Sequence, residues 1–236
     1  MNSDNEHVSE MAKTHPDAAQ EQGRWQGAVT DWSADKQVFD MSWGKLMMWV
    51  FLLSDTFIFS IFLTGYMNAR MSTTEPWPFA SEVFALTIAG HHIPLILIAI
   101  MTFILITSSG TMAMAVTYAY RGNRKVAVYL MLATAVLGAS FVGMQAFEWS
   151  KLIIEEGVRP WGNPFGAAQF GASFFMITGF HGLHVSAGVI LLLVIAKRVH
   201  QGVYQKKGLQ IVEITGLYWH FVDLVWVFIF AFFYLW

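Results

Sequence analysis

The sequence contains no cysteine and few charged residues. Among its 236 residues, Asp, Glu, Lys and Arg together make up 13%, whereas they make up about a quarter of soluble domains. The missing cysteine excludes thiolate metal sites, iron-sulfur clusters, disulfides and covalently attached c-type haem. The low charge, together with 56% hydrophobic residues, excludes an ordinary soluble domain and indicates an integral membrane protein. We expect no nucleic-acid partner.

Long apolar runs predict the fold. A helix needs about 20 mostly apolar residues to cross about 30 Å of hydrocarbon, and five runs of this kind are present. They predict an all-α membrane protein, a bundle of five transmembrane helices. Proline, glycine and charged residues separate the runs. The runs lie at about residues 43–67, 91–119, 126–150, 168–196 and 211–236.

The basic residues predict how the chain crosses the membrane. If the N-terminus is inside, 11 of the 14 lysines and arginines lie in inner segments and three lie in outer loops. The positive-inside rule therefore predicts the N-terminus inside and the C-terminus outside. We expect residues 1–42 to form a polar cytoplasmic tail and residues 43–236 the five-span membrane domain. The tail lacks the basic start and short apolar core of a signal peptide.

Small residues recur at every fourth position of the third and fourth spans. This spacing lets helix backbones approach closely, so we expect both stripes to be packing surfaces. The stripes are Ala135, Ala139 and Gly143, and Thr178, Gly182 and Ser186.

Several ionisable residues fall inside the predicted spans, where a charge at the bilayer centre costs about 2.5–3.5 kcal/mol. With a rise of 1.5 Å per residue, Asp55, His184 and Asp223 all lie about 18 Å from the inner edge. We therefore expect a polar layer that links the first, fourth and fifth spans, with Glu148 closer to the outer interface, where solvent or the second outer loop can serve it. The candidate residues of this buried polar or proton-handling network are Asp55, Glu148, His181, His184, His220 and Asp223.

The residues alone leave three interpretations of this layer open: a structural hydrogen-bonded network, a proton route, and a haem or metal site. Facing histidines on two helices are what a haem needs, and His181, His184 and His220 are the candidates. A di-iron site would need Glu-x-x-His pairs, which the sequence lacks. A transporter would favour repeated halves and broken helices, which are not evident.

Five motifs, one on each predicted span, together resemble one family. They read MWVFLLSDTFIFS, ITSSGTM, FVGMQAFEW, TGFHGLHVSAG and YWHFVDLVWVFIF in chain order. They are similar to the motifs of subunit III of the haem-copper oxidases, the respiratory cytochrome c and quinol oxidases. The resemblance covers about residues 43–236, and it is specific because the motifs fall on separate helices in the family's order.

This resemblance implies an accessory subunit with no catalytic residue, metal ligand or cofactor of its own. The haems and copper would belong to partner subunits I and II of an oxidoreductase complex in a bacterial inner (plasma) membrane. The chain would stabilise the catalytic subunit and support proton uptake, in contact with membrane lipids and with bound phospholipid. Asp55 occupies the family position of a buried carboxylate that is glutamate in many members.

Two alternative functions stand beside the accessory-subunit interpretation. Longer members of the family have seven spans, and this sequence predicts the five-span bacterial form. Related subunits occur beside nitric oxide reductases, so a partner of such an enzyme is one alternative function. A membrane b-type cytochrome that uses the intramembrane histidines is the other.

Overall fold

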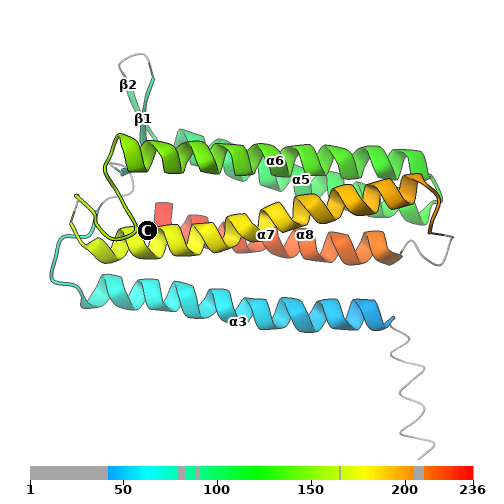
Figure 1. The fold of residues 1–236 in the computed structure, drawn as a ribbon, viewed down its shortest axis with the longest axis horizontal. Coiled ribbons are helices and arrows are strands. Elements are labelled where there is room, and N and C mark those ends of the chain that lie inside the picture. The colour runs from blue at the N-terminus through cyan, green and yellow to red at the C-terminus, as the bar shows by residue number, and fades with distance from the viewer. Residues whose placement is uncertain (1–41, 79–82, 89–90, 165, 205–209, 236) are drawn as a thin grey trace, which may run out of the picture. The chain divides into compact units, whose positions relative to one another are not determined.

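The computed structural model describes residues 42–78, 83–88, 91–164, 166–204 and 210–235. The chain divides into two units, residues 1–46 and 47–236. The predicted cytoplasmic tail lies, up to residue 41, outside the described residues. The second unit is a helical bundle (Figure 1).

Within the described residues, five helices are long and apolar enough to cross a membrane, which confirms the predicted all-α five-span architecture. Their bounds lie within five residues of the predicted ones, and the largest differences are at the end of the first helix and at the start of the second. The helices are α3 (Trp43–Ser72), α5 (Ile96–Tyr120), α6 (Arg124–Ile154), α7 (Ala168–His200) and α8 (Gln210–Phe230), the last of which continues as a π-helix at Ala231–Leu235.

The second helix begins later than the sequence predicts. The segment expected to open it forms a strand, β2 (His91–Pro94), which pairs antiparallel with β1 (Ala85–Ile88). Leu95 follows with a left-handed φ of 62°, and α5 starts at Ile96. The prediction of a span from residue 91 is therefore wrong: the strand reads His-His-Ile-Pro, so neither its two histidines nor its proline continues the apolar run, and that run begins only after Pro94.

The helices pack as a ring of four with a fifth beside it. Helix α5 packs against α6 and α8, and α7 packs against the same two helices (Figure 1). The backbone of α3 stays further from its neighbours than theirs do from one another. Side chains make its contacts: the Phe59 and Phe180 ring centroids are 5.4 Å apart, and those of Tyr66 and Phe233 are 4.1 Å apart.

Trp219 of α8 occupies the centre of the ring and is completely buried. A Cβ atom built on Gly138 of α6 would lie 2.3 Å from its indole ring, and one on Gly188 of α7 would lie 2.9 Å away. The indole Nε1 donates a hydrogen bond to Ser108 Oγ of α5, at 2.9 Å. One side chain therefore contacts all three neighbouring helices, and two glycines make room for it.

The predicted small-residue stripes are packing surfaces only in part. Ala135 and Thr178 are buried as expected. A Cβ atom on Gly143 or Gly182, in contrast, would meet no other atom within 4 Å. The stripe prediction is therefore wrong for these two glycines, because no neighbouring helix comes close enough to either of them to require the absence of a side chain.

The packing around Trp219 predicts opposite effects for two glycine substitutions on α6. Gly138→Ala should destabilise the chain by about 1–3 kcal/mol, because the new methyl group overlaps the indole ring. Gly143→Ala should be neutral or should stabilise it by up to about 1 kcal/mol, because alanine favours the helix and meets open space. The free energy of unfolding of the purified chain in mixed micelles measures both. Equal losses in the two variants would contradict this account of the packing.

Candidate functional site

The structure places Asp55 of α3 against His184 of α7. Both side chains are largely buried, and Asp55 Oδ2 lies 3.5 Å from His184 Nε2, an ion-pair separation without hydrogen-bond geometry. The other ring nitrogen, Nδ1, lies 2.8 Å from the backbone oxygen of Phe180. The Tyr218 hydroxyl of α8 donates to the backbone oxygen of His184 at 3.0 Å. This cluster thus connects the first, fourth and fifth spans.

The geometry restricts how Asp55 and His184 share protons. Because a carbonyl oxygen only accepts hydrogen bonds, His184 Nδ1 carries a hydrogen and donates it to Phe180. His184 Nε2 faces Asp55 Oδ2 at 3.5 Å, and an imidazolium beside a carboxylate at this separation forms a pair with no net charge. A pair of this kind is far less costly at membrane depth than a single charge.

His220 and Asp223 of α8 face α5. His220 Nδ1 lies 2.6 Å from Ser109 Oγ, which is a hydrogen bond between the fifth and second spans. Asp223 is buried one turn further along α8, near the hydroxyls of Ser108 and Ser109. Neither of its carboxyl oxygens has a hydrogen-bond partner among the described residues. The pair therefore extends to the second span, which the predicted layer did not include.

His181 lies apart from both clusters, in an aromatic pocket. Its ring stacks on Trp226 with centroids 5.4 Å apart and meets the edges of Phe141 and Phe59 at 5.8 and 6.5 Å. Neither ring nitrogen has a hydrogen-bond partner in the described part of the chain. The same part brings no three His, Asp or Glu side chains together in a way that could hold a metal ion.

Glu148 of α6 is buried. From its position near the outer interface, we expected its carboxyl group to contact solvent or the second outer loop. Gln145 Nε2 donates to Glu148 Oε2 at 3.0 Å, and the Tyr234 hydroxyl approaches the two carboxyl oxygens at 3.3 and 3.4 Å. The end of α8 thus provides the partner expected from a loop. The depth of Glu148 along α6 could not reveal this partner. Tyr234 belongs to a different part of the chain and follows the last motif.

The six candidate residues therefore fall into four environments within the bundle. Several of their partners were not predicted from the sequence, notably Ser109, Tyr218 and Tyr234. The signal for Ser109 was present, since a cluster of hydroxyl side chains, Thr107 to Ser109, interrupts the mostly apolar second run. Taken together, the geometry defines a multi-pass membrane bundle whose buried polar groups contact one another between helices.

The comparison with known proteins identifies the family. Residues 31–236 match the family described as cytochrome c oxidase subunit III. The chain is 31% identical over 195 residues to cytochrome c oxidase subunit 3 of Alkalihalophilus pseudofirmus, which covers 80% of this chain and 85% of that protein. It is 30% identical over 197 residues to a probable quinol oxidase subunit 3 of Staphylococcus aureus, with 84% and 90% covered.

The chain belongs to the cytochrome c oxidase subunit III family. This confirms the resemblance found in the five motifs. The family implies association with other oxidase subunits, and the five helices make the chain a multi-pass membrane protein. The matches favour neither a nitric oxide reductase partner nor a b-type cytochrome.

The contact between Asp55 and His184 generates a prediction for α3. Asp55→Leu should destabilise the bundle by about 1–3 kcal/mol, because it leaves His184 Nε2 buried without a polar neighbour. Asp55→Asn should cost less, because the amide keeps a hydrogen-bonding group. Adding His184→Phe to Asp55→Leu should cost less than the sum of the single changes. Denaturant unfolding of the four variants measures the coupling, and strictly additive losses would show that the two side chains do not interact.

Proposed function

We propose that the chain is the non-redox accessory subunit III of a proton-pumping haem-copper terminal oxidase, which reduces oxygen to water. The observation that carries the proposal is the family match, which extends over all five helices. The partners in this proposal are subunits I and II, which would hold the haems and copper, together with membrane lipids. The two relatives differ in the electron donor that their names state, so the proposal includes cytochrome c and quinol alike.

The proposed location is the plasma membrane of a bacterium, in agreement with the bacterial origin of the relatives. The proposed orientation places the N-terminus inside and the C-terminus outside, because this arrangement puts 11 of 14 basic residues on the inner side. Residues 1–42 then form a cytoplasmic tail, and residues 43–236 form the membrane domain.

The proposed role of the polar residues is to fix the helices that support the catalytic subunit. Asp55 and His184 attach α3 to α7, and His220 attaches α8 to α5. Glu148 and Tyr234 join the outer ends of α6 and α8. Asp55 and His184 also place two ionisable side chains next to each other inside the bundle, which supports the proposed contribution to proton uptake.

Removal of the subunit should shorten the time for which the oxidase stays active, and it should leave the redox centres in place. We expect an oxidase purified without this chain to retain its full haem content and its initial rate of oxygen reduction, and then to lose activity progressively. Parallel haem spectra and oxygen-consumption traces of the complex with and without the chain measure both. Loss of one haem with the chain would contradict the proposal and favour the b-type cytochrome.

A reporter fusion tests the proposed orientation. Alkaline phosphatase fused after Trp236 should be active, because the C-terminus is placed outside and the enzyme folds only there. The same enzyme fused after Val203, in the connection between α7 and α8, should be inactive and serves as the control. The reverse pattern would show that the N-terminus faces outward.

A further inference from the structure

His220 lies near the middle of α8, and its side chain is partly exposed at the surface of the bundle. It follows Gln210, the first residue of α8, by ten residues, which is about 15 Å along the helix axis. Ser109 Oγ lies 2.6 Å from His220 Nδ1, and Ser109 is likewise near the middle of α5. A membrane around the bundle would present only hydrocarbon at this depth.

One nitrogen of the His220 ring has no partner. Ser109 engages Nδ1, but no hydrogen bond engages Nε2 in the part of the chain that the structure describes. The chain also does not enclose Nε2, whereas it encloses both ring nitrogens of His181. A neutral imidazole has one N–H donor and one bare nitrogen acceptor, so Nε2 keeps an unused donor or acceptor in either tautomer. Lipid acyl chains provide no group that matches it.

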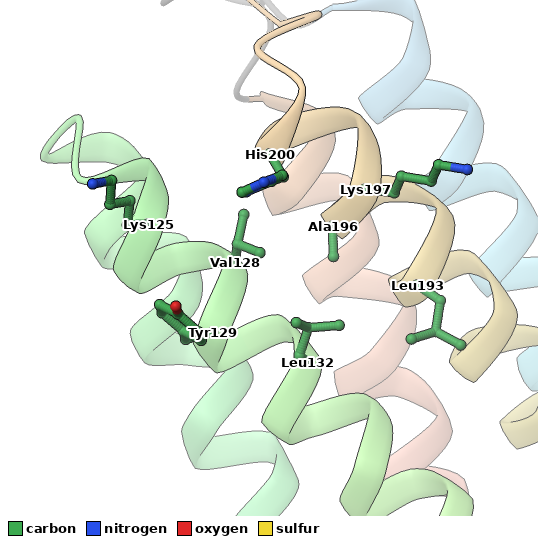
Figure 2. Close-up of a pocket in the computed structure, with 8 residues that line it drawn as sticks. All are labelled: Lys125, Val128, Tyr129, Leu132, Leu193, Ala196, Lys197 and His200. Carbon is green, nitrogen blue, oxygen red and sulfur yellow. The ribbon is translucent and has the colours of Figure 1, made fainter.

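Several other exposed polar side chains of the spans need no external partner. The Ser60 and Thr107 hydroxyls each donate to the backbone oxygen four residues earlier in their own helix. Figure 2 shows Lys125 and Lys197 near the ends of α6 and α7, where a long side chain reaches water. His220 has neither option, because its ring already contacts another helix and its side chain is too short to reach the helix end.

We propose that a transmembrane helix of another oxidase subunit docks beside His220 and hydrogen-bonds to its Nε2 atom. The docking surface, which we call the α5–α8 face, includes the exposed Ile106, three residues before Ser109, and the exposed Leu224, four residues after His220. Hydroxyl and carboxamide groups both donate and accept hydrogen bonds, so either kind of side chain on the partner helix matches Nε2 in both tautomers. The surface needs only a helical membrane partner, and the identity of that partner as an oxidase subunit rests on the proposed function.

Two other occupants fit the α5–α8 face less well. Phospholipid head groups lie at the membrane interface and not at this depth, and acyl chains have no donor or acceptor. A second copy of this chain would bring two His220 rings together. A hydrogen bond between these rings needs opposite tautomers in residues that have the same contact with Ser109. The family, in contrast, implies association with other oxidase subunits.

Two substitutions separate the roles of the two ring nitrogens. An asparagine amide lies about as far from the backbone as Nδ1, whereas a glutamine amide reaches about as far as Nε2. An oxidase depleted of this chain is titrated with the fluorescently labelled full chain in detergent. His220→Gln should bind like the unaltered chain, and His220→Asn should bind about threefold to tenfold more weakly, the effect of one lost hydrogen bond.

The stability of the isolated chain should rank these variants in the opposite order. Asparagine should keep the contact with Ser109 that joins α8 to α5, and glutamine should lose it. Denaturant unfolding should therefore show His220→Gln to be the less stable variant. If His220 acted only within the chain, His220→Gln would also bind the oxidase more weakly. That result, or equal affinities of the two variants, would overturn the proposal.

Ile190→Asn is the matched control for the position of the amide. Ile190 is exposed on α7, ten residues before His200 at the helix end, so its depth is similar to that of His220. Helix α7 is not part of the α5–α8 face, so this variant should bind the depleted oxidase like the unaltered chain. An equal loss of affinity in Ile190→Asn and His220→Asn would overturn the proposal, because the effect would not be specific to His220.

Photo-crosslinking in native membranes identifies the partner. With benzoylphenylalanine in place of Leu224, the full chain in its complex should form an adduct with another oxidase subunit, detected by mass spectrometry. An adduct with a second copy of this chain, or with phospholipid alone, would overturn the proposal and leave the proposed oxidase role intact. An adduct with a protein outside the oxidase would contradict both.

Discussion

The structure depends on one constraint: inside a bilayer no water is available to satisfy a polar group. A buried polar side chain is therefore stabilised by a contact with its own helix or with another helix, and a contact of the second kind joins two helices. Among the described residues, His181 and Asp223 have no such hydrogen bond. Asp55 meets His184, His220 meets Ser109, and Glu148 meets the end of α8. The positions of the polar side chains therefore determine which helices are joined and at what depth, whereas apolar side chains fill the space between these contacts.

The number of spans was predictable because membrane thickness fixes the length of a helix, and that length is visible as an apolar run. The start of α5 was not predictable in this way. Strand β2 contains two histidines and Pro94, but in a long apolar window its four residues are outweighed by the apolar residues that follow them, and the strand pairing itself is not visible in composition. The sequence also did not reveal which glycines pack against a neighbouring helix. Whether Gly138 or Gly143 meets a neighbour depends on the rotation of α6 about its axis.

The same distinction applies to the polar residues. The rise per residue gives depth, so the similar levels of Asp55, His184 and Asp223 could be worked out from the sequence. Depth does not give the direction in which a side chain points around its helix. His220 consequently reaches Ser109 of α5, and His181 turns toward Trp226 instead of a polar partner. Both directions follow from the order of helices around the bundle, which a single sequence does not contain.

The unequal packing of the helices gives the pair of Asp55 and His184 its importance. Helices α5 to α8 approach one another closely along their backbones and share Trp219, so the loss of one polar contact among them leaves many others. Helix α3 is attached mainly through side chains, and it exposes many of its large apolar residues. If Asp55 were replaced and His184 left buried without a polar neighbour, the attachment of α3 would therefore weaken more than the packing of the other four helices. In the proposed complex, that change would reach the catalytic subunit through the placement of α3, without any contact between Asp55 and a redox centre.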